Sequence, residues 1–236
     1  MSASRFGRYE LLTTDPPKAG AFYEAVFGAD FWGPDVTLGA LPERALALGA
    51  RPHFRAHLAV PDLQRTLASM VAAGGQQLGP LLPGADGSAR AGLRDPFGAI
   101  LALSSESMPA SRGRVAWHLM ASRDHEKAFA LYAQLCGWQP LQALELAERG
   151  RHQTFGWDAA SAAVGSFSDV ARAPGVHPQW LCFFRVADIA QATATVEAQG
   201  GFALPVAQAP DGALVAACDD AQGAAFGLYQ PASPSS

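Results

Sequence analysis

Alternating apolar and polar residues, followed by a helical pattern, recur along the chain and define its elements. The first such unit is a strand that ends at Asp15 and a helix that stops at Gly28. Asp15 is a favourable N-cap, and the two prolines after it fall where the first helical turn tolerates a missing N–H. The same unit returns 109 positions later, between Asp124 and Gly137 (124 − 15 and 137 − 28). A unit repeated in register predicts a duplicated fold.

A second pair of related units follows the same plan. An alternating strand over residues 54–60 precedes Asp62, and another over residues 180–186 precedes Asp188. A Gly-Gly pair ends each of the two helices, and the two units are displaced by 126 positions (188 − 62). Each half of the chain therefore contains two units, and the two halves resemble each other.

Short apolar runs bounded by turn residues follow each helix and predict further strands. They cover residues 31–32, 36–38, 44–48, 77–82, 89–94, 100–103, 143–147, 154–157, 162–167 and 225–229. The chain thus consists of four modules in which a strand and a helix precede three more strands. Residues 104–113 are polar and have no apolar period, which predicts a linker between domains at 5–104 and 113–230.

The composition bounds the class of protein. Of the 236 residues, 49% are apolar and 16% charged, which is typical of a globular protein. The net charge of −4 argues against nucleic acid as a partner, because phosphate binding needs clustered Lys and Arg. No apolar run spans a bilayer and no signal peptide is visible, so we expect a cytoplasmic protein without membrane partners. Cys136, Cys182 and Cys218 lack CxxC spacing and are expected to be reduced core thiols.

Several sequence features resemble those of one family, over nearly the whole chain from Arg8 to Tyr229. They are the helix ends Phe22-Tyr23…Phe27-Gly28 and Leu131-Tyr132…Cys136-Gly137, the turn Asp95-Pro96-Phe97-Gly98-Ala99, and the strands 9–15 and 117–120. With them the chain resembles the vicinal oxygen chelate superfamily, which includes glyoxalase I, bleomycin-resistance proteins and extradiol dioxygenases. It looks closest to the two-domain branch loosely called lactoylglutathione-lyase-related. Because this fold hosts many chemistries, the resemblance indicates the fold and not the reaction.

The resemblance implies an α+β fold of four βαβββ modules paired into two half-barrel domains, each around a cavity. Side chains of a strand alternate between the two faces of its sheet. Residues two, four and six before each N-cap Asp should therefore face the helix: Thr13, Leu11, Tyr9; Val60, Leu58, Ala56; Ser122, Met120, His118; Val186, Phe184, Cys182. Residues three, five and seven before it should face the cavity: Leu12, Glu10, Arg8; Ala59, His57, Arg55; Ala121, Leu119, Trp117; Arg185, Phe183, Leu181.

The metal-binding positions of the family hold no ligand here. Metal-dependent members place His or Gln seven residues before the N-cap Asp, and Glu seven residues after the Asp of the closing turn. In this chain those positions hold Arg8, Arg55, Trp117, Leu181, Ala102 and Gly227. Cations and apolar groups do not bind a divalent ion, so we expect no metal and no other cofactor. One alternative stays open, in which Glu10 and His57 are two ligands of a metal site; His53 lies too far along the strand to join them.

Polar residues of the first half form a candidate catalytic and binding site. Glu10 and His57 occupy equivalent places in the first two modules, and a carboxylate near an imidazole can act with it as an acid–base pair. The alternative is a structural ion pair or an inert polar lining. Arg8 and Arg55 could hold a carboxylate or phosphate of a small ligand. Equally, they could form salt bridges with Glu10.

The second half offers an apolar candidate site. Trp117 and Phe183, with Tyr229, could stack on a planar ligand, and the alternative is a filled core. Arg185 lies among them, and a single cation in an apolar wall suits an anionic aromatic ligand. It could also lie at the strand end and reach solvent.

Other histidines are expected to have no chemical role. His118 lies near the family's metal-binding His, but the alternation points it at the helix, so we interpret it as a core histidine. His125, His152 and His177 fall at a helix start or in loops and are expected to be solvated.

Three functions are compatible with these sequence features. The most favoured is recognition of a small organic molecule in a half-barrel cavity without a metal, as in binding or sequestering proteins related to drug resistance. The second is a lyase, isomerase or hydroxylase-type enzyme that uses Glu10, His57 and an arginine as acid, base and anion clamp. The least favoured is a metal-dependent glyoxalase or dioxygenase. Whether the molecule is turned over, which cavity binds it and whether the chain forms a homodimer stay open.

Overall fold

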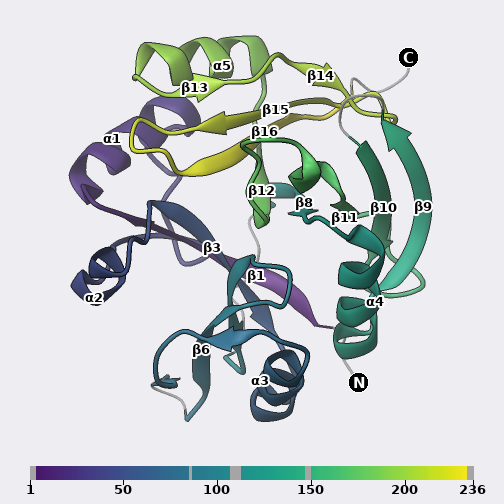
Figure 1. Cartoon of the computed structure of the whole chain (residues 1–236). Coiled ribbons are helices and arrows are strands. Elements are labelled where there is room, and N and C mark those ends of the chain that lie inside the picture. The colour runs from purple at the N-terminus through teal and green to yellow at the C-terminus, as the bar shows by residue number, and fades with distance from the viewer. Residues whose placement is uncertain (1–3, 85–86, 107–112, 147–149, 233–236) are drawn as a thin grey trace. The chain divides into compact units, whose positions relative to one another are not determined.

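Helices and strands alternate along the whole chain in a computed structural model, which describes residues 4–84, 87–106, 113–146 and 150–232 (Figure 1). The helices are α1 Pro16–Phe27, α2 Glu43–Ala47, α3 Leu63–Ala72, α4 His125–Cys136, α5 Ile189–Ala198 and a short 3₁₀ helix, η2, Val170–Arg172. Strands β1–β7 belong to a seven-stranded sheet and β8–β16 to a nine-stranded sheet. The predicted α+β class is therefore confirmed.

The strands of the first sheet are β1 Arg5–Thr13, β2 Val36–Ala40, β3 His53–Ala59, β4 Gln76–Gln77, β5 Leu82–Pro83, β6 Ala89–Arg94 and β7 Ile100–Ser104. Those of the second are β8 Val115–Ala121, β9 Gln139–Leu146, β10 Gly150–Gly156, β11 Gly165–Ser168, β12 Gln179–Arg185, β13 Phe202–Ala203, β14 Ala207–Gln208, β15 Leu214–Asp219 and β16 Ala225–Gln230.

The predicted N-caps are confirmed at all four long helices. The side chains of Asp15, Asp62, Asp124 and Asp188 each accept a hydrogen bond from the backbone N–H three residues later, at 3.2, 2.9, 3.1 and 3.0 Å. Each bond satisfies one of the donors that a helix start leaves without a partner. Gly137 ends α4 in the left-handed conformation with φ 77°, which only glycine adopts without strain.

The chain divides into two compact units. Unit 1 contains residues 1–8, 56–110 and 118–180, and unit 2 contains residues 9–55, 111–117 and 181–236. Each unit therefore combines segments from both predicted domains, because it joins a module of the first half to one of the second. The boundaries at 5–104 and 113–230 remain a prediction.

In unit 1, strands pair in the orders β3-β7-β6-β4 and β8-β11-β10-β9, with β5 also on β6. Helix α3 packs on β6 and β7, and α4 packs on β10 and β11. Between α4 and its sheet lies an aromatic core in which neighbouring ring centroids are about 5 Å apart. Its fully or nearly fully buried members are Phe6, Tyr132, Trp138, Phe155, Phe167 and Trp180.

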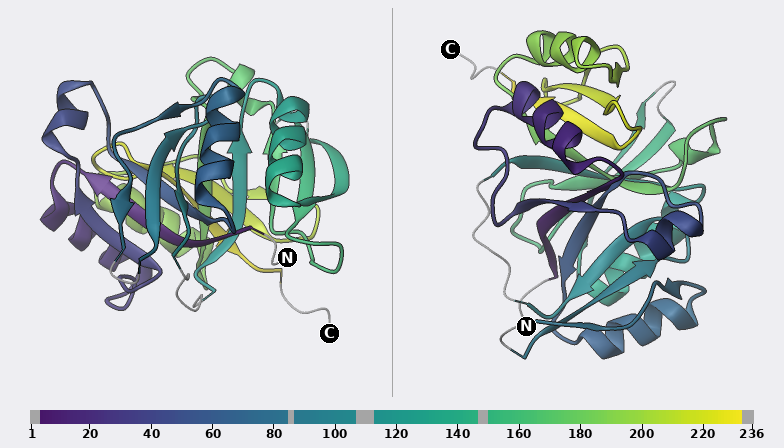
Figure 2. Two further views of the ribbon diagram at one scale, coloured as in Figure 1. Left: turned by 90° about the horizontal axis from the view of Figure 1, so that it is seen from below. Right: turned by 90° about the vertical axis from the view of Figure 1, so that its left-hand side faces the viewer.

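In unit 2, β1 runs parallel to β2, and β12, β16 and β15 are neighbours with β13 and β14 on β15. Helix α5 packs on β15 and β16, as the right-hand view of Figure 2 shows with the green helix over the yellow strands. Helix α1 packs against α5. The core beside α1 contains the rings of Tyr23, Phe27, Phe31, Phe184 and Phe226.

Burial distinguishes the two predicted faces at only some positions, because Leu12, His57 and Phe183 of the predicted cavity face are buried too. Leu11, Leu58 and Met120, which should face helices, are fully buried. On the opposite face of the same strands, Glu10 and Arg55 are only partly buried. Glu10 lies one position from Leu11 and Arg55 three positions from Leu58, so each projects from the face of its strand opposite to that buried leucine.

Two predicted strands of the first module are wrong. Residues 31–32 form no strand, and residues 44–48 fall largely in helix α2. The segment contains Glu, Arg, Leu and Ala, all good helix formers, and a short apolar run does not distinguish a helix from a strand. The predicted linker at 104–113 lies mostly outside the described residues. Within the described part of the chain, no helix combines the length and apolar character needed to cross a membrane.

Candidate functional site

Glu10 and Arg55 form an ion pair in unit 2. Arg55 lies on β3 and donates a hydrogen bond from Nη2 to Oε2 of Glu10 on β1, at 2.5 Å. The two side chains are 22% and 25% exposed, so the pair is mostly shielded from water. Gly39 of β2 lies beside it, where a Cβ would stand 3.6 Å from Oε1 of Glu10. For Arg55, the salt-bridge alternative is therefore confirmed.

Arg8 forms a separate ion pair in unit 1. Its Nη1 donates to Oε2 of Glu106 at 2.9 Å, and Arg90 approaches Oε1 of the same carboxylate at 3.6 Å. Glu106 is held in turn, since its backbone N–H donates to the hydroxyl of Ser104. Sequence reasoning missed Glu106, because a pairing with a residue 98 positions away leaves no local signal.

Both arginines keep one buried donor without a partner. Among the described residues, nothing accepts a hydrogen bond from the Nε of Arg8 or from the Nε of Arg55. A buried N–H without an acceptor costs about 1–3 kcal/mol, a cost that an acceptor able to reach it would remove. The carboxylates of Glu106 and Glu10 leave these Nε donors unsatisfied.

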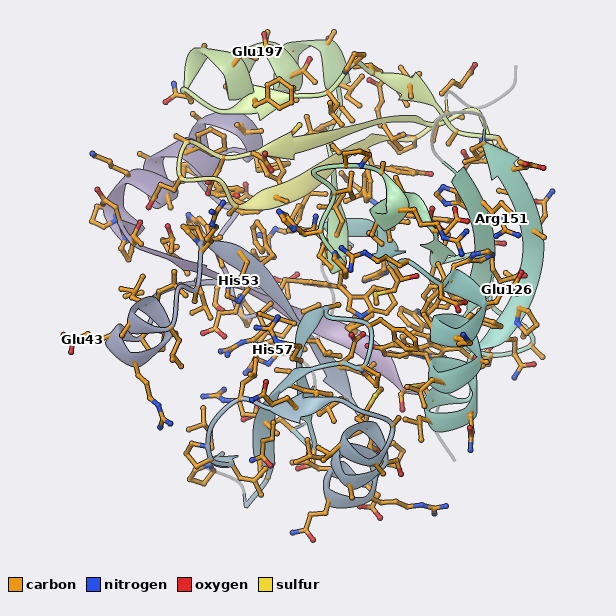
Figure 3. The ribbon with its side chains drawn as sticks, viewed as in Figure 1. Glu43, His53, His57, Glu126, Arg151 and Glu197 are labelled. Carbon is orange, nitrogen blue, oxygen red and sulfur yellow. The ribbon has the colours of Figure 1, made fainter. Side chains whose placement is uncertain are left out.

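His57 lies on β3 in unit 1 and is 1% exposed (Figure 3). It stands in parallel register with Ala102 of β7, which is the position of a family metal-binding Glu. Ala102 offers no ligand atom. The use of His57 with Glu10 as an acid–base pair remains a prediction.

The aromatic candidates of the second half are packed rather than open. Phe183 of β12 is 7% exposed and stands in register with Gly227 of β16. Its ring occupies the space that a side chain at Gly227 would need. This packing favours the filled-core alternative for Phe183. Trp117 of β8 is partly buried.

Arg185 lies at the end of β12 and is exposed. Its Nε donates to the backbone oxygen of Gly113 at 2.9 Å, and its guanidinium lies 5.6 Å from the ring centroid of Tyr229. Arg185 therefore reaches solvent, the alternative that the sequence left open for it. The binding of a ligand by Trp117, Phe183 or Arg185 remains a prediction.

The metal ion that the resemblance to the family implies does not fit the residues at its ligand positions. The family ligand positions hold Arg8 and Arg55, each engaged by a carboxylate, and the small or apolar residues Trp117, Leu181, Ala102 and Gly227. In the described ranges, no group of three His, Cys, Asp or Glu side chains is placed to hold an ion. The remaining pair, Glu10 and His57, would supply fewer ligands than the usual three.

His118 is a core histidine, as predicted. It is 5% exposed, its Nδ1 lies 2.9 Å from the oxygen of Val164, and its ring stacks on Phe6 at 5.0 Å. Burial lowers its pKa to about 4, so it is neutral at physiological pH. The three cysteines are free and buried, as predicted, and burial raises the pKa of Cys136 and of Cys218 to about 12.

The prediction that His125 is solvated is wrong. His125 is 7% exposed, and its Nδ1 lies 4.0 Å from Oδ2 of Asp169, the residue that follows β11. His152 is partly buried, with Nδ1 3.1 Å from the hydroxyl of Ser166. His177 is exposed, as predicted.

No family model matches the chain, but curated proteins and solved structures do. A relative from Mycobacterium tuberculosis, provisionally named glyoxylase CFP32, is 26% identical over 94% of this chain and 93% of its own length. The 2,3-dioxygenase LapB from Pseudomonas sp. KL28 has a TM-score of 0.64 at 12% identity, covering 99% of this chain and 94% of that one. The Mn(II)-bound glyoxalase from Novosphingobium aromaticivorans has a TM-score of 0.63 at 13% identity, covering 98% and 83%. The fold and the glyoxylase-named relative together confirm the likeness of this chain to the vicinal oxygen chelate superfamily.

Proposed function

We propose that this protein binds a small organic acid or aldehyde without a catalytic metal, and that buried arginine N–H groups hold the oxygen of that molecule. The observation that carries the proposal is the buried Nε of Arg55, which has no acceptor among the described residues although Nη2 of the same side chain binds Glu10. Arg8 repeats this arrangement in unit 1. A carboxylate or carbonyl oxygen would satisfy such a donor.

The ion pairs narrow the class of ligand. Each guanidinium is already neutralised by a carboxylate, Arg55 by Glu10 and Arg8 by Glu106. A multiply charged anion such as a phosphate would be repelled by the neighbouring carboxylate. A monocarboxylate or an uncharged carbonyl compound fits better.

The same residues argue against a divalent ion at the family positions. A guanidinium cannot be deprotonated under ordinary conditions and repels a metal ion. Arg8 and Arg55 stand where the metal-dependent members of the superfamily have their first ligands. We therefore place the chain with proteins that keep the fold and recognise a molecule by hydrogen bonds.

A second candidate is a metal-independent lyase, isomerase or hydroxylase-type enzyme at the same site. Glu10, whose carboxylate is held by Arg55, would take a proton from a bound substrate. His57 would serve as the partner acid or base. A metal-dependent glyoxalase or dioxygenase remains the least favoured function.

A thermal-shift screen of the full-length protein against small acids, aldehydes and aromatic compounds tests the proposal, since a true ligand raises the apparent stability. For the best ligand, R55Q and R8Q are then compared with R65Q, which changes an exposed arginine of α3. We expect R55Q, R8Q or both to weaken binding at least about tenfold and R65Q to leave it unchanged. Equal affinities of all three variants would overturn the proposal.

Turnover is tested with E10Q and H57A. Loss of turnover with retained affinity in either variant supports the enzyme. Binding without any turnover in the parent protein supports a binding or sequestering role.

A further inference from the structure

A hollow of about 440 Å³ opens between helix α4 and the hairpin β9–β10 of unit 1. Its volume lies in the range of small-molecule sites. It is formed entirely by one module and is separate from Arg55 and Glu10. The lining residues are His125, Glu126, Phe129, Ala143, Leu144, Glu145, Arg151, His152 and Gln153.

The register of the hairpin decides which of these side chains face the helix. Arg151 of β10 is the antiparallel partner of Glu145 of β9, and partnered residues project on the same face. Arg151 approaches Glu126 of α4, with 3.8 Å between Nη1 and Oε1 (Figure 3). Arg151 and Glu145 therefore both project towards the helix and into the hollow. His152, one residue along, projects from the opposite face and binds Ser166 there.

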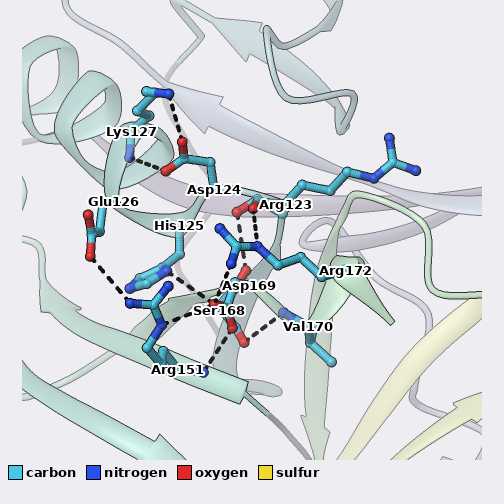
Figure 4. A network of polar contacts seen from close by, with 11 residues as sticks. Arg123, Asp124, His125, Glu126, Lys127, Arg151, Ser168, Asp169, Val170 and Arg172 are labelled. Carbon is cyan, nitrogen blue, oxygen red and sulfur yellow. Dashed lines mark hydrogen bonds and ion pairs between the residues drawn. The ribbon is translucent and has the colours of Figure 1, made fainter. Parts of the chain in front are cut away.

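Asp169 fixes the position of Arg151 (Figure 4). Its Oδ1 accepts from the backbone N–H of Arg151 at 2.9 Å and its Oδ2 from the Nε at 3.2 Å. Burial opposes ionisation of Asp169, but hydrogen bonds and charge from Arg151, with the charge of His125, hold the pKa of its carboxyl below the usual value. Asp169 thus anchors the Nε edge of the guanidinium, while Nη1 points towards Glu126, another lining residue of the hollow.

The hollow presents two opposite charges and an apolar wall. Arg151 supplies the cation, while Glu145 and Glu126 supply carboxylates, both on exposed positions. Phe129 lies one turn after Glu126 on α4 and packs edge-on against Phe167, with 5.4 Å between the ring centroids. Ala143, on the same face of β9 as Glu145, leaves the wall beside Phe129 open to an apolar group.

We propose that this hollow binds a free amino acid with an apolar side chain. The ligand carboxylate pairs with the Nη groups of Arg151, its ammonium group pairs with Glu145, and its side chain lies on Phe129. A fork of two parallel N–H donors matches a carboxylate, and the ammonium group of a zwitterion offsets the negative charge of Glu145. A ligand without the ammonium group brings its carboxylate close to Glu126 and Glu145 with no positive charge to offset them, and a ligand without the carboxylate makes no bond to the Nη groups of Arg151.

Calorimetric titration of the full-length protein with L-phenylalanine tests this proposal. Two analogues lack one charge each: phenethylamine lacks the carboxylate, and 3-phenylpropionate lacks the ammonium group. We expect saturable binding of L-phenylalanine and at least about tenfold weaker binding of both analogues. The proposal is overturned if neither L-phenylalanine nor L-leucine binds saturably. It is also overturned if either analogue binds as tightly as L-phenylalanine.

Matched variants locate the binding. R151Q and E145Q should each weaken L-phenylalanine binding at least about tenfold, and E145Q lies at an exposed strand position where folding is not at risk. The control is R172Q, because Arg172 also approaches Asp169, at 3.8 Å, but does not line the hollow. Retained affinity in E145Q, or an equal loss in R172Q and R151Q, contradicts the assignment. The hollow shares no lining residue with the site of Arg55 and Glu10, so the outcome does not depend on the function proposed above.

Discussion

The hydroxyl of Tyr132 donates a hydrogen bond to Oδ2 of Asp95 at 2.9 Å, and both side chains are almost fully buried. Asp95 belongs to the closing turn of the second module, where its Oδ1 accepts from the backbone of Phe97 and Ala99. Tyr132 belongs to the helix of the third module. This bond thus ties a turn of the first half of the chain to a helix of the second half within unit 1.

Unit 2 contains the counterpart of this bond. The hydroxyl of Tyr23 donates to Oδ2 of Asp220 at 3.2 Å. Tyr23 follows Asp15 by the same eight positions by which Tyr132 follows Asp124 (23 − 15 and 132 − 124). The repeated bond gives a physical reason why each compact unit combines modules from both halves.

The first prediction concerns Y132F and Y23F. Tyr132 also accepts a hydrogen bond from Nε1 of Trp180 at 3.1 Å, so Y132F leaves two buried polar groups unsatisfied. We expect Y132F to lower the free energy of unfolding by roughly 2–4 kcal/mol and Y23F by about half as much. Urea denaturation at pH 7 measures the free energy of unfolding of both variants. A loss of stability in Y23F that equals or exceeds the loss in Y132F would contradict the prediction.

The second prediction concerns pH. Burial raises the pKa of Asp95 from 3.8 to about 6, although hydrogen bonds from Tyr132 and the turn backbone oppose the shift. The folded chain therefore keeps this proton between pH 3.8 and 6 while the unfolded chain has lost it. Because the folded state binds more protons in this window, the contribution of Asp95 to stability falls as the pH rises, by roughly 3 kcal/mol in total.

D95N removes this titration and serves as the reference. The unfolding free energy of the parent protein minus that of D95N should decrease between pH 4 and pH 6 and stay level above pH 7. Denaturation curves of both proteins across this range give the difference. A difference that is constant or rises with pH would show that Asp95 is ionised throughout.

Much of the fold could be predicted from the sequence because its signals are local. An Asp before an amphipathic run sets a helix start, and the period of a strand decides which face each side chain takes. These signals located the four long helices and the core position of His118. They did not identify helix α2, because Ala and Leu at alternating positions suit a short helix as well as a strand.

The site could be predicted only in part. The strand phase placed Glu10 and Arg55 on one face, and their ion pair was among the alternatives. Glu106, which binds Arg8, and Asp169, which lies beside His125, could not be found, because each is far from its partner in the sequence. Such pairings depend on how modules pack, which neither composition nor periodicity encodes.

The third prediction concerns Gly227, which stands at a family metal-binding position. A Cβ there would overlap the ring of Phe183, so G227A should destabilise the fold by about 1–3 kcal/mol. F183L should restore part of this loss in the double variant. Thermal denaturation of the two single variants and of the double variant measures this coupling between the two residues. The control is G20A in helix α1, where the added methyl makes only an ordinary contact with Leu38 at 3.6 Å. Additive effects of F183L and G227A would mean that the two residues do not share this space.

The most direct test of the proposal that this protein works without a catalytic metal is elemental analysis of the full-length protein, purified with and without added Mn, Fe, Ni and Zn. Because Arg8 and Arg55 repel a divalent ion and Ala102 and Gly227 offer no ligand atom, we expect each metal to remain far below one ion per chain in both preparations. About one ion per chain that is lost in E10Q or H57A would contradict this conclusion.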